Sequence, residues 1–426
     1  MRLDEYVDIE RNERAERRRL AEEKSYGILD HLETFQDRFE EVVQGDSIYG
    51  GVSPSIFVGR SNYPRVSTGI LSPVGVDDAD EAATYETSAG WYDEGISIAD
   101  VFRRRTSLLN TNKSATADVH DAWDGFVGTQ REVAIADRPV TVEVGLDESP
   151  DLDFDVSGGD VGTPVGPRAR AESAKLAENP HVPRQVKKTL EDDDWNAQGA
   201  MTYLYRRGFD VYDVNTILSA GALGRADQRK LVPTRWSITA VDDTVSKFLR
   251  GTIRDEQSVD EIEVYRNEFM GNAYWILLAP GTWEFELVEM KAPGSVWNPD
   301  LEEGVSLSSA REGYEGRTGY VEETAGAYYA SRLGVLEHLS ERGRQAKVLV
   351  LRHVSDEYWG PTGVWQVREG VRHAFEDEGA RAETFAGAVR DVVEYLPVSL
   401  ADLRRKSTMV AGLQTSLADF ADTSSD

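Results

Sequence analysis

The sequence has no cysteine in its 426 residues, which excludes disulfide bonds, thiolate metal sites and a cysteine nucleophile. Histidine is scarce as well, and its six copies, at positions 31, 120, 181, 338, 353 and 373, include no pair at metal-binding spacing. The HExxH pattern of zinc proteases and the GxSxG pattern of serine hydrolases are both missing. From the absence of these motifs we expect no metal ion and no other cofactor.

Long apolar runs are also missing. The first 19 residues carry charge throughout, so they cannot form a signal peptide. The longest apolar stretch, at residues 274–279, is far shorter than the ~20 residues that a membrane-spanning helix needs. We expect a soluble, cytoplasmic protein that makes no contact with a membrane.

Positive charge is in deficit, with 47 basic against 76 acidic residues and a formal charge of −29. Only ten of the basic residues are lysine, and the other 37 are arginine. This composition is typical of a halophilic protein, because salt near 1 M shortens the Debye length to ~3 Å and screens self-repulsion. Salt also weakens the counterion-release term of DNA binding, so we expect any DNA surface to depend on short arginine contacts, backbone amides and stacking.

What is present is enough for a large folded body, since 40% of the residues are hydrophobic and nine are tryptophan. Length predicts two or three domains. A charged helix is expected within residues 1–45, a Gly/Ser/Pro-rich stretch at 45–75, a loop at 147–167 and a flexible tail at 397–426.

Hydrophobic periodicity predicts the remaining elements. Helices are expected at residues 168–179, 182–190, 198–207, 214–220, 241–254, 324–341, 364–376 and 382–395, and strands at 140–144, 261–269, 273–278, 283–290 and 347–354. Turn signals such as Pro280-Gly281 separate three consecutive strands, which predicts an antiparallel meander. The fold class is α+β, or mixed α/β.

The C-terminal tail contains the run QTSLADFA, beginning at Gln414. Leu417 and Phe420 are three residues apart, so one short helical turn presents both apolar side chains on one side, while Gln414 can hydrogen-bond nearby. The spacing resembles the PIP box, the peptide that binds the PCNA sliding clamp. Ala421 occupies the second aromatic position, so we expect a weak, micromolar ligand. The alternative is an acidic halophilic tail in which the pattern arises by chance.

Residues 47–69 have the composition of a phosphate or backbone cradle. Gly50, Gly51, Gly59 and Gly69 are expected to expose amides in conformations with positive φ. Two arginines can clasp phosphate oxygens and aromatic side chains can stack on bases. The contact residues predicted here are Arg60, Tyr63 and Arg65. The alternative is a loop whose aromatic side chains only pack.

Residues 221–243 gather basic side chains and a tryptophan in an otherwise acidic chain, as a nucleic-acid surface requires. The contact residues predicted here are Arg225, Arg235 and Trp236, beside Arg229 and Lys230. Asp242 and Asp243 are candidates for catalytic acids or metal ligands, but Thr239 and Asp242 have capping-box spacing, so the two acids can instead stabilise the start of a helix.

Two further basic islands are Arg103-Arg104-Arg105, with Lys113 nearby, and the group Arg184, Lys187 and Lys188. In an acidic protein such islands more often pair with carboxylates than contact phosphate. The acidic runs at residues 77–81 and 192–194 have the side chains to hold Mg²⁺, but solvated surface is the expected role of such runs.

Residues 47–66, residues 230–246 and the C-terminal peptide together resemble the archaeal Nre DNA repair family, most closely its NreA branch. The resemblance runs from about residue 47 to the tail. It implies an N-terminal Nre domain at 46–292 and a C-terminal α/β domain at 293–396. It also implies a cytoplasmic repair protein that binds the sliding clamp and DNA and acts beside excision-repair proteins. Some members carry a cysteine-based zinc finger, which this sequence cannot form.

Two functions remain open from the sequence. In the first, the protein is a clamp-recruited factor that binds damaged DNA through residues 47–69 and 225–236. In the second, it is a hydrolase or nuclease acting on modified DNA or nucleotide ends, with Asp242 or Asp243 as base or as ligand of Mg²⁺. A deep pocket that joins Arg60, Tyr63, Arg235 and an acid favours the enzyme, and a shallow basic surface favours the recruited factor.

Overall fold

The structure is a computed structural model that describes residues 48–120, 123–147, 165–298 and 300–413. The helix predicted within residues 1–45 and the clamp-binding peptide lie outside the described residues. The chain divides into two compact units, which we describe separately. Unit 1 comprises Met1–Phe248 and Gly360–Trp365, and unit 2 comprises Leu249–Trp359 and Gln366–Asp426. Each unit combines a mixed sheet with helices, which confirms the predicted α+β class.

Unit 1 is built on a six-stranded sheet with the order β1-β5-β6-β4-β3-β2. Its strands are β1 (Ile48–Ser53), β2 (Ser55–Val58), β3 (Arg65–Pro73), β4 (Leu108–Thr116), β5 (Val140–Leu146) and β6 (Arg168–Leu176). Neighbouring strands are antiparallel except β4 and β6, which are parallel. Buried and half-buried residues alternate along β5, so Val140, Val142 and Val144 face the core, as the strand predicted there requires.

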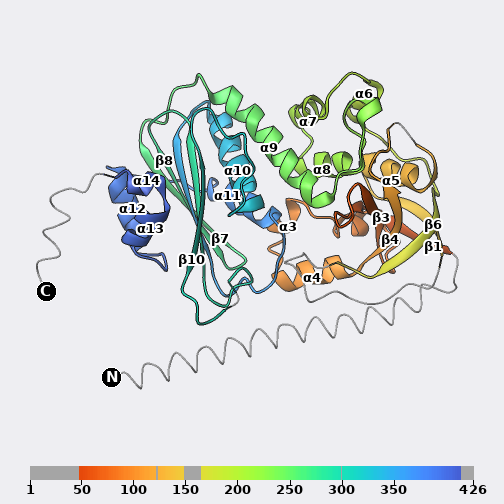
Figure 1. Ribbon diagram of the computed structural model, residues 1–426, viewed down its shortest axis with the longest axis horizontal. Coiled ribbons are helices and arrows are strands. Elements are labelled where there is room, and N and C mark those ends of the chain that lie inside the picture. Colours follow the sequence, from red (N-terminus) through yellow and green to blue (C-terminus); the bar gives the residue numbers. More distant parts are fainter. Residues whose placement is uncertain (1–47, 121–122, 148–164, 299, 414–426) are drawn as a thin grey trace, which may run out of the picture. The chain divides into compact units, whose positions relative to one another are not determined.

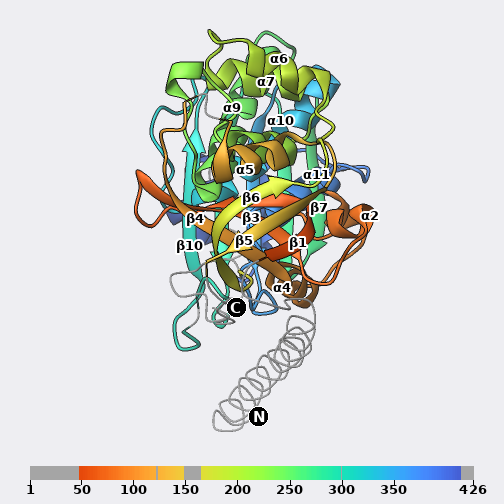
Figure 2. The same ribbon diagram turned by 90° about the vertical axis from the view of Figure 1, so that its right-hand side faces the viewer.

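Helices of unit 1 cover and flank this sheet. They are α2 (Ala79–Ala83), α3 (Gly90–Asp93), α4 (Ile98–Thr106), α5 (Gly125–Ile135), α6 (Arg184–Glu191), α7 (Ala197–Arg206), α8 (Val211–Ser219), the 3₁₀ turn η1 (Ala226–Gln228) and most of α9 (Thr234–Ile253). Helix α5 packs against the sheet (Figures 1 and 2), where Phe126 and Val133 join the core valines of β5.

One prediction for unit 1 is wrong. Residues 168–179, expected to be helical, contain strand β6. Alanine, glutamate and lysine favour helix by propensity, but Ala169 and Ala171 alternate with exposed neighbours and pair into the sheet, so tertiary context decides. The Gly/Ser/Pro-rich stretch at 45–75 contains strands β1 to β3.

Unit 2 is built on a second six-stranded sheet with the order β10-β9-β11-β8-β7-β12. Its strands are β7 (Ile262–Phe269), β8 (Asn272–Ala279), β9 (Glu284–Lys291), β10 (Ser306–Glu312), β11 (Lys347–Val354) and β12 (Ala380–Ala382). Its helices are α10 (Ala325–Arg342), α11 (Trp365–Ala374, whose first residue belongs to unit 1), α12 (Phe385–Val393), α13 (Leu400–Lys406) and α14 (Thr408–Ala411).

Helices lie on both faces of the unit 2 sheet, with α10 and α11 on one face and α12 to α14 on the other (Figure 1). Strand β8 is therefore buried along its whole length, which explains its continuous apolar sequence. The predicted meander is wrong, because β11 lies between β8 and β9 and runs parallel to β9. Strand β11 comes from much later in the sequence, and turn signals between consecutive strands do not predict such pairing.

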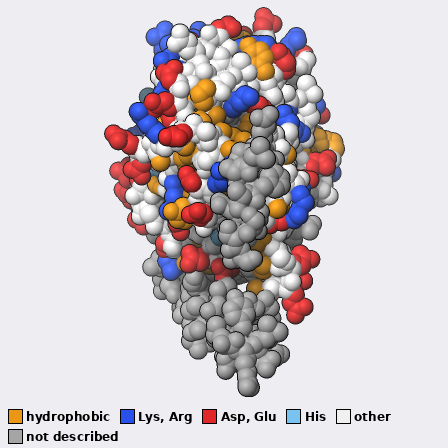
Figure 3. All heavy atoms as spheres, turned by 90° about the vertical axis from the view of Figure 1, so that its left-hand side faces the viewer, with side chains coloured by type: hydrophobic (Ala, Val, Ile, Leu, Met, Phe, Trp, Pro, Cys, Tyr) orange, Lys and Arg blue, Asp and Glu red, His pale blue; other side chains and the backbone are white. Residues whose placement is uncertain are grey.

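The described part of unit 2 extends to Leu413, and α13 and α14 lie beyond the predicted start of the tail at residue 397. Helices α13 and α14 pack on the sheet, where Leu403 and Val410 join Trp275 and Leu277 in one core. Viewed from the side of α12 to α14, the surface intersperses acidic and basic side chains (Figure 3). Among the described residues, no helix is long and apolar enough to cross a membrane.

The division in space differs from the predicted division near residue 292. Strands β9 and β10 lie on either side of that position and pair along their whole length in one sheet. The compact units instead divide after Phe248, within α9.

Candidate nucleic-acid interface

The loop between β2 and β3 presents the contact residues predicted for the first segment. Two backbone hydrogen bonds close it, from Tyr63 N to Arg60 O at 3.3 Å and from Arg65 N to Asn62 O at 2.8 Å. The side chains of Arg60, Tyr63 and Arg65 are exposed. The loop is short and its backbone is hydrogen-bonded internally, so the backbone that carries these side chains has a defined conformation.

The structure contradicts the predicted glycine cradle. None of Gly50, Gly51, Gly59 and Gly69 has a positive φ. The first two pair with β5, and Gly59 N donates to a β3 carbonyl at 2.7 Å. Glycine is required at position 69 for steric reasons, because a Cβ there would lie 2.0 Å from Asn110 Oδ1. The predicted contact with a nucleic acid at this segment therefore depends on the side chains of the loop.

The start of α9 presents the contact residues of the second segment. Thr234, its first residue, accepts a hydrogen bond from Val58 N at 3.0 Å and lies 3.2 Å from the hydroxyl of Ser219. These bonds hold the start of α9 at the end of β2. Arg235 and Trp236 are exposed on the first turn of the helix.

The two segments meet at an aromatic pair. The ring centroids of Tyr63 and Trp236 are 5.2 Å apart and their planes are tilted by 56°. Tyr63 is 42% exposed and Trp236 is 45% exposed, so part of each ring faces solvent. Exposed rings can stack on nucleobases without regard to sequence, each base contributing about 1–3 kcal/mol. We call Arg60, Tyr63, Arg235 and Trp236 the aromatic-arginine surface.

The arginines near this pair differ in their partners. No carboxylate of the described residues forms an ion pair with Arg60 or Arg235. Arg65 Nε donates to Ser114 Oγ at 3.0 Å. Arg225 Nε lies 3.9 Å from Asp227 Oδ1, which offsets part of its charge. Arg60 and Arg235 are therefore the arginines best placed to offer a bidentate fork to phosphate.

Arg229 and Lys230 serve other purposes. Arg229 is buried and donates to Gly224 O at 3.0 Å and to Leu190 O at 2.8 Å, so it supports the fold. Lys230 Nζ lies 2.9 Å from Asp118 Oδ1. This hydrogen bond raises the pKa of Lys230 and lowers the pKa of Asp118.

Asp242 and Asp243 lie inside α9 rather than at its start. The helix begins at Thr234, so the predicted capping box of Thr239 and Asp242 is wrong. Asp242 is 1% exposed, and Asp243 Oδ2 lies 2.6 Å from Lys247 Nζ. In the described ranges, no three His, Asp or Glu side chains form a group that could hold a metal ion.

Glu86 is an acid of unit 1 that no sequence pattern singled out. Its carboxyl accepts a hydrogen bond from Thr216 Oγ1 at 3.4 Å and interacts with the hydroxyl of Ser55. Burial, and to a smaller extent the neighbouring Asp213, raise the pKa of Glu86 to about 7. Burial raises the pKa of Asp213 too.

The two further basic islands have different surroundings. Arg103 pairs with Asp100 at 2.5 Å and Arg104 pairs with Glu94, as expected for an acidic protein. Lys188 instead lies over aromatic rings of a cleft beside α7. No motif identified this cleft, and the only signal for it is the spacing of Tyr203, Arg206 and Arg207 on one helix.

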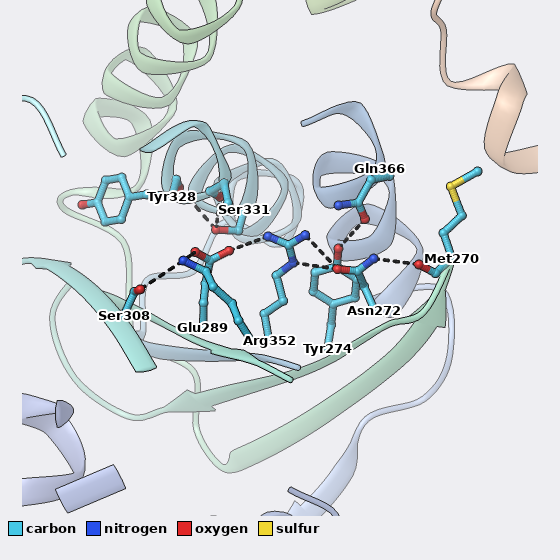
Figure 4. Close-up of polar contacts among 11 residues, drawn as sticks. Met270, Asn272, Tyr274, Glu289, Ser308, Tyr328, Ser331, Arg352 and Gln366 are labelled. Carbon is cyan, nitrogen blue, oxygen red and sulfur yellow. Dashed lines mark hydrogen bonds and ion pairs between the residues drawn. The ribbon is translucent and has the colours of Figure 1, made fainter. Parts of the chain in front are cut away.

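Unit 2 carries charge in its interior (Figure 4). Buried Arg352 donates from Nε and Nη2 to Asn272 Oδ1, at 3.1 and 2.7 Å, and from Nη1 to buried Glu289. Beside it, Tyr274 OH donates to Gln366 Oε1 at 2.7 Å, and burial raises the pKa of Tyr274. The network joins β8, β9, β11 and α11, so it stabilises the fold of unit 2.

Comparison with known families and proteins gives consistent matches. Residues 20–298 match the family described as "Archaeal Nre, N-terminal" and residues 312–420 match "Archaeal Nre, C-terminal". The chain is 78% identical over 422 residues to DNA repair protein NreA of Haloferax volcanii. The aligned region covers 99% of this chain and 100% of that protein.

Two more distant relatives come from Archaeoglobus fulgidus. DNA repair protein NreA of that organism is 37% identical, over 90% of this chain and 93% of the relative. DNA repair protein NreB is 34% identical, over 88% and 92%. No solved structure matches the chain. By the matches to both of its domains and to these relatives, the chain belongs to the archaeal Nre family.

Proposed function

We propose that this protein acts in DNA repair and is recruited to DNA by the PCNA sliding clamp, which binds its C-terminal peptide. Relatives that carry the name DNA repair protein are similar over most or all of their length, which supports the repair function. The spacing of Gln414, Leu417 and Phe420 supports the clamp as partner.

The position of the peptide is the observation that carries the clamp proposal. Leu413 packs against the unit 2 core and is the last described residue, and Gln414 follows it directly. The peptide therefore starts directly after a residue that packs on the core of unit 2.

Helix α14, just before the peptide, is anchored by a buried carboxylate of strand β9. Glu286 accepts hydrogen bonds from Thr408 N at 2.7 Å, Met409 N at 2.8 Å and Ser407 Oγ at 2.8 Å. A carboxylate at a helix start compensates the partial positive charge of the free amides. The residues just before the peptide are therefore held on the sheet of unit 2.

DNA contact in this proposal belongs to the aromatic-arginine surface, with Arg65 and Arg225 beside it. Exposed rings, and arginines that pair with no carboxylate of the described residues, suit a chain that works in concentrated salt. Stacking and short hydrogen bonds depend less on salt than counterion release does. The enzyme alternative requires an acid that faces substrate. Asp242 is buried and Asp243 is ion-paired, so we do not propose that alternative.

The clamp proposal is tested by titrating the full chain against the sliding clamp in molar KCl. We compare the unmodified protein, Phe420→Ala, a truncation after Leu413 and the control Thr415→Ala, which changes the peptide outside the motif. Phe420→Ala removes the aromatic side chain that the proposal places in the clamp, and it should weaken binding by about tenfold or more. Truncation should abolish binding and the control should retain it. Equal binding after truncation would overturn the proposal.

A further inference from the structure

A cleft of about 670 Å³ lies between α7 and α9 in unit 1. It is lined by three aromatic and three basic side chains, which are Trp195, Tyr203, Phe248, Arg206, Arg207 and Lys247, and its other lining residues are uncharged. None of the described residues that line it is acidic, although the chain has 76 acidic and only 47 basic residues. The wall of this cleft therefore has the opposite charge to the molecule as a whole.

Two of the aromatic rings form a pair flanked by cations. The centroids of Trp195 and Tyr203 are 4.9 Å apart. Lys188 Nζ lies 5.8 Å from the first centroid and 5.1 Å from the second, and Arg207 Cζ lies 5.3 Å from that of Tyr203. These are cation–π distances, so the rings help to hold the positive groups in place.

The cations of the cleft mostly lack carboxylate partners. Lys188, Arg206 and Arg207 form no ion pair with any carboxylate in the described part of the chain, whereas Lys247 pairs with Asp243 at 2.6 Å. The nearby Asp192 carboxylate is turned to the backbone, where it accepts from the amide of residue 194 at 3.2 Å and from that of residue 195 at 3.1 Å. The guanidinium N–H groups of the cleft therefore have room for an anion.

A ligand that satisfies both features has a flat ring and an anionic group. A nucleotide has both, because its base can stack on an aromatic pair and its phosphate can accept from an arginine fork. A volume of about 670 Å³ falls within the range of about 300–1,000 Å³ that is usual for small-molecule sites. A carboxylate ligand would use the cations but leave the rings without a role.

We propose that this cleft binds a nucleotide, with the base against Trp195 and Tyr203 and the phosphate held by Arg206 and Arg207. The nucleotide comes either from solution or from a DNA strand. The cleft is distinct from the aromatic-arginine surface, because Thr244, its first lining residue on α9, is eight residues beyond Trp236, or about 12 Å along the helix. The proposal does not depend on the clamp.

The test is a titration of the full chain in molar KCl, without divalent metal, by calorimetry. The probes are AMP, dAMP, inorganic phosphate and a short single-stranded DNA. The variant is the double substitution Arg206→Ala and Arg207→Ala, and the control is Arg138→Ala, an exposed arginine that does not line the cleft. Loss of charge-assisted hydrogen bonds should weaken binding by about tenfold or more in the double variant and leave the control unchanged.

Each outcome decides the proposal. Binding of AMP or dAMP that the double variant loses supports it and identifies the free nucleotide as ligand. Binding of only the single strand, lost in the same variant, supports it and identifies a nucleotide within DNA. The proposal is overturned if no probe binds, if the double variant binds as well as the unmodified chain, or if inorganic phosphate binds as tightly as AMP.

A second measurement covers a double variant that fails to fold. In the unmodified chain, the bound probe should slow amide hydrogen exchange in residues 197–206 and 244–248, and slowing only elsewhere contradicts the proposal. Clamp binding is measured in parallel and should be unchanged in the double variant, so failure of the nucleotide site and failure of the clamp proposal are distinguishable.

Discussion

In unit 2, Arg332 and Arg352 are buried and each pairs with a buried glutamate, whereas in unit 1 Arg60 and Arg235 are exposed and pair with no carboxylate of the described residues. The same side chain therefore has two uses in one molecule. Arg332 and Arg352 each need this carboxylate, since an unpaired charge in the interior costs several kcal/mol. An exposed arginine without a partner, in a chain with 76 acidic residues, keeps its donors available for a ligand.

Two groups of aromatic side chains also differ in their exposure. In unit 1, Tyr63 and Trp236 form a half-exposed pair beside unpaired arginines. In unit 2, Tyr274 is buried and bonded to Gln366 within the polar network. We propose that unit 1 carries the nucleic-acid contacts, and that the charges inside unit 2 stabilise its fold.

The largest expected effect comes from removing a buried partner in unit 2. Glu289→Ala leaves Arg352 buried without its carboxylate, and we expect a loss of about 3–5 kcal/mol in the free energy of unfolding. Urea denaturation in molar KCl measures it. The matched control is Glu261→Ala, which breaks the exposed pair of Glu261 with Arg381 at 2.8 Å and should cost less than about 1 kcal/mol. Equal losses in the two variants would break the distinction between buried and exposed arginines.

A smaller effect is expected from Glu86, a partly buried acid of unit 1 held by hydroxyl groups instead of an arginine. Its pKa is about 7 in the folded protein against 4.5 as a reference, so the folded state keeps a proton that the unfolded state releases. The free energy of unfolding should fall as pH rises from 4.5 to 7 and level off above, by at most about 3 kcal/mol. Glu86→Gln should remove most of this slope, and Asp213 contributes a slope of the same sign.

Urea denaturation at pH 5 and pH 8 measures the difference between the two proteins. An unchanged slope in Glu86→Gln would show that the carboxyl titrates normally in the fold.

Next in size is the stacking contribution in unit 1. Trp236→Ala and Tyr63→Ala should each weaken binding of single-stranded DNA by about tenfold, because a stacked base is worth about 1–3 kcal/mol. Fluorescence anisotropy at constant KCl measures the affinity. The control is Tyr395→Ala in unit 2, where the side chain is 65% exposed. An equal loss in the control would remove the distinction between the units.

The smallest expected effect concerns the exposed arginines themselves. Arg60→Ala and Arg235→Ala should each lower DNA affinity a few-fold and reduce the slope of log affinity against log salt by up to about 1. A KCl series measures the slope. Arg225→Ala should change it less, because Arg225 lies near Asp227. A larger effect from Arg225 than from Arg235 would reverse the assignment within the surface.

Local patterns predicted the elements well where one physical signal dominated. Strand β11 occupies the predicted residues 347–354, and α10 begins and ends within one residue of its prediction, because an apolar run and a long periodic pattern leave little choice. Strand β6 was missed since its residues favour helix and only its sheet partners make it a strand. The position of β11 between β8 and β9 depends on pairing between distant segments, which no local pattern encodes.

The candidate surface was predictable in its residues but not in its assembly. Composition selected both segments, yet their meeting depends on the bond from Val58 N to Thr234 Oγ1, 176 residues apart in sequence. Sequence cannot distinguish exposed Arg235 from buried Arg229, because burial depends on the fold around each side chain. Sequence does not predict the cleft beside α7, because its residues come from separate helices and match no motif.

The most direct test of this account is photo-crosslinking of the full chain to single-stranded DNA that carries photoreactive bases, in molar KCl, with the crosslinked residues identified by mass spectrometry. We expect crosslinks in unit 1, at Tyr63 or Trp236, and their loss when both are replaced by alanine. Crosslinks confined to unit 2, or an unchanged pattern after both substitutions, would contradict the assignment of DNA contact to the aromatic-arginine surface.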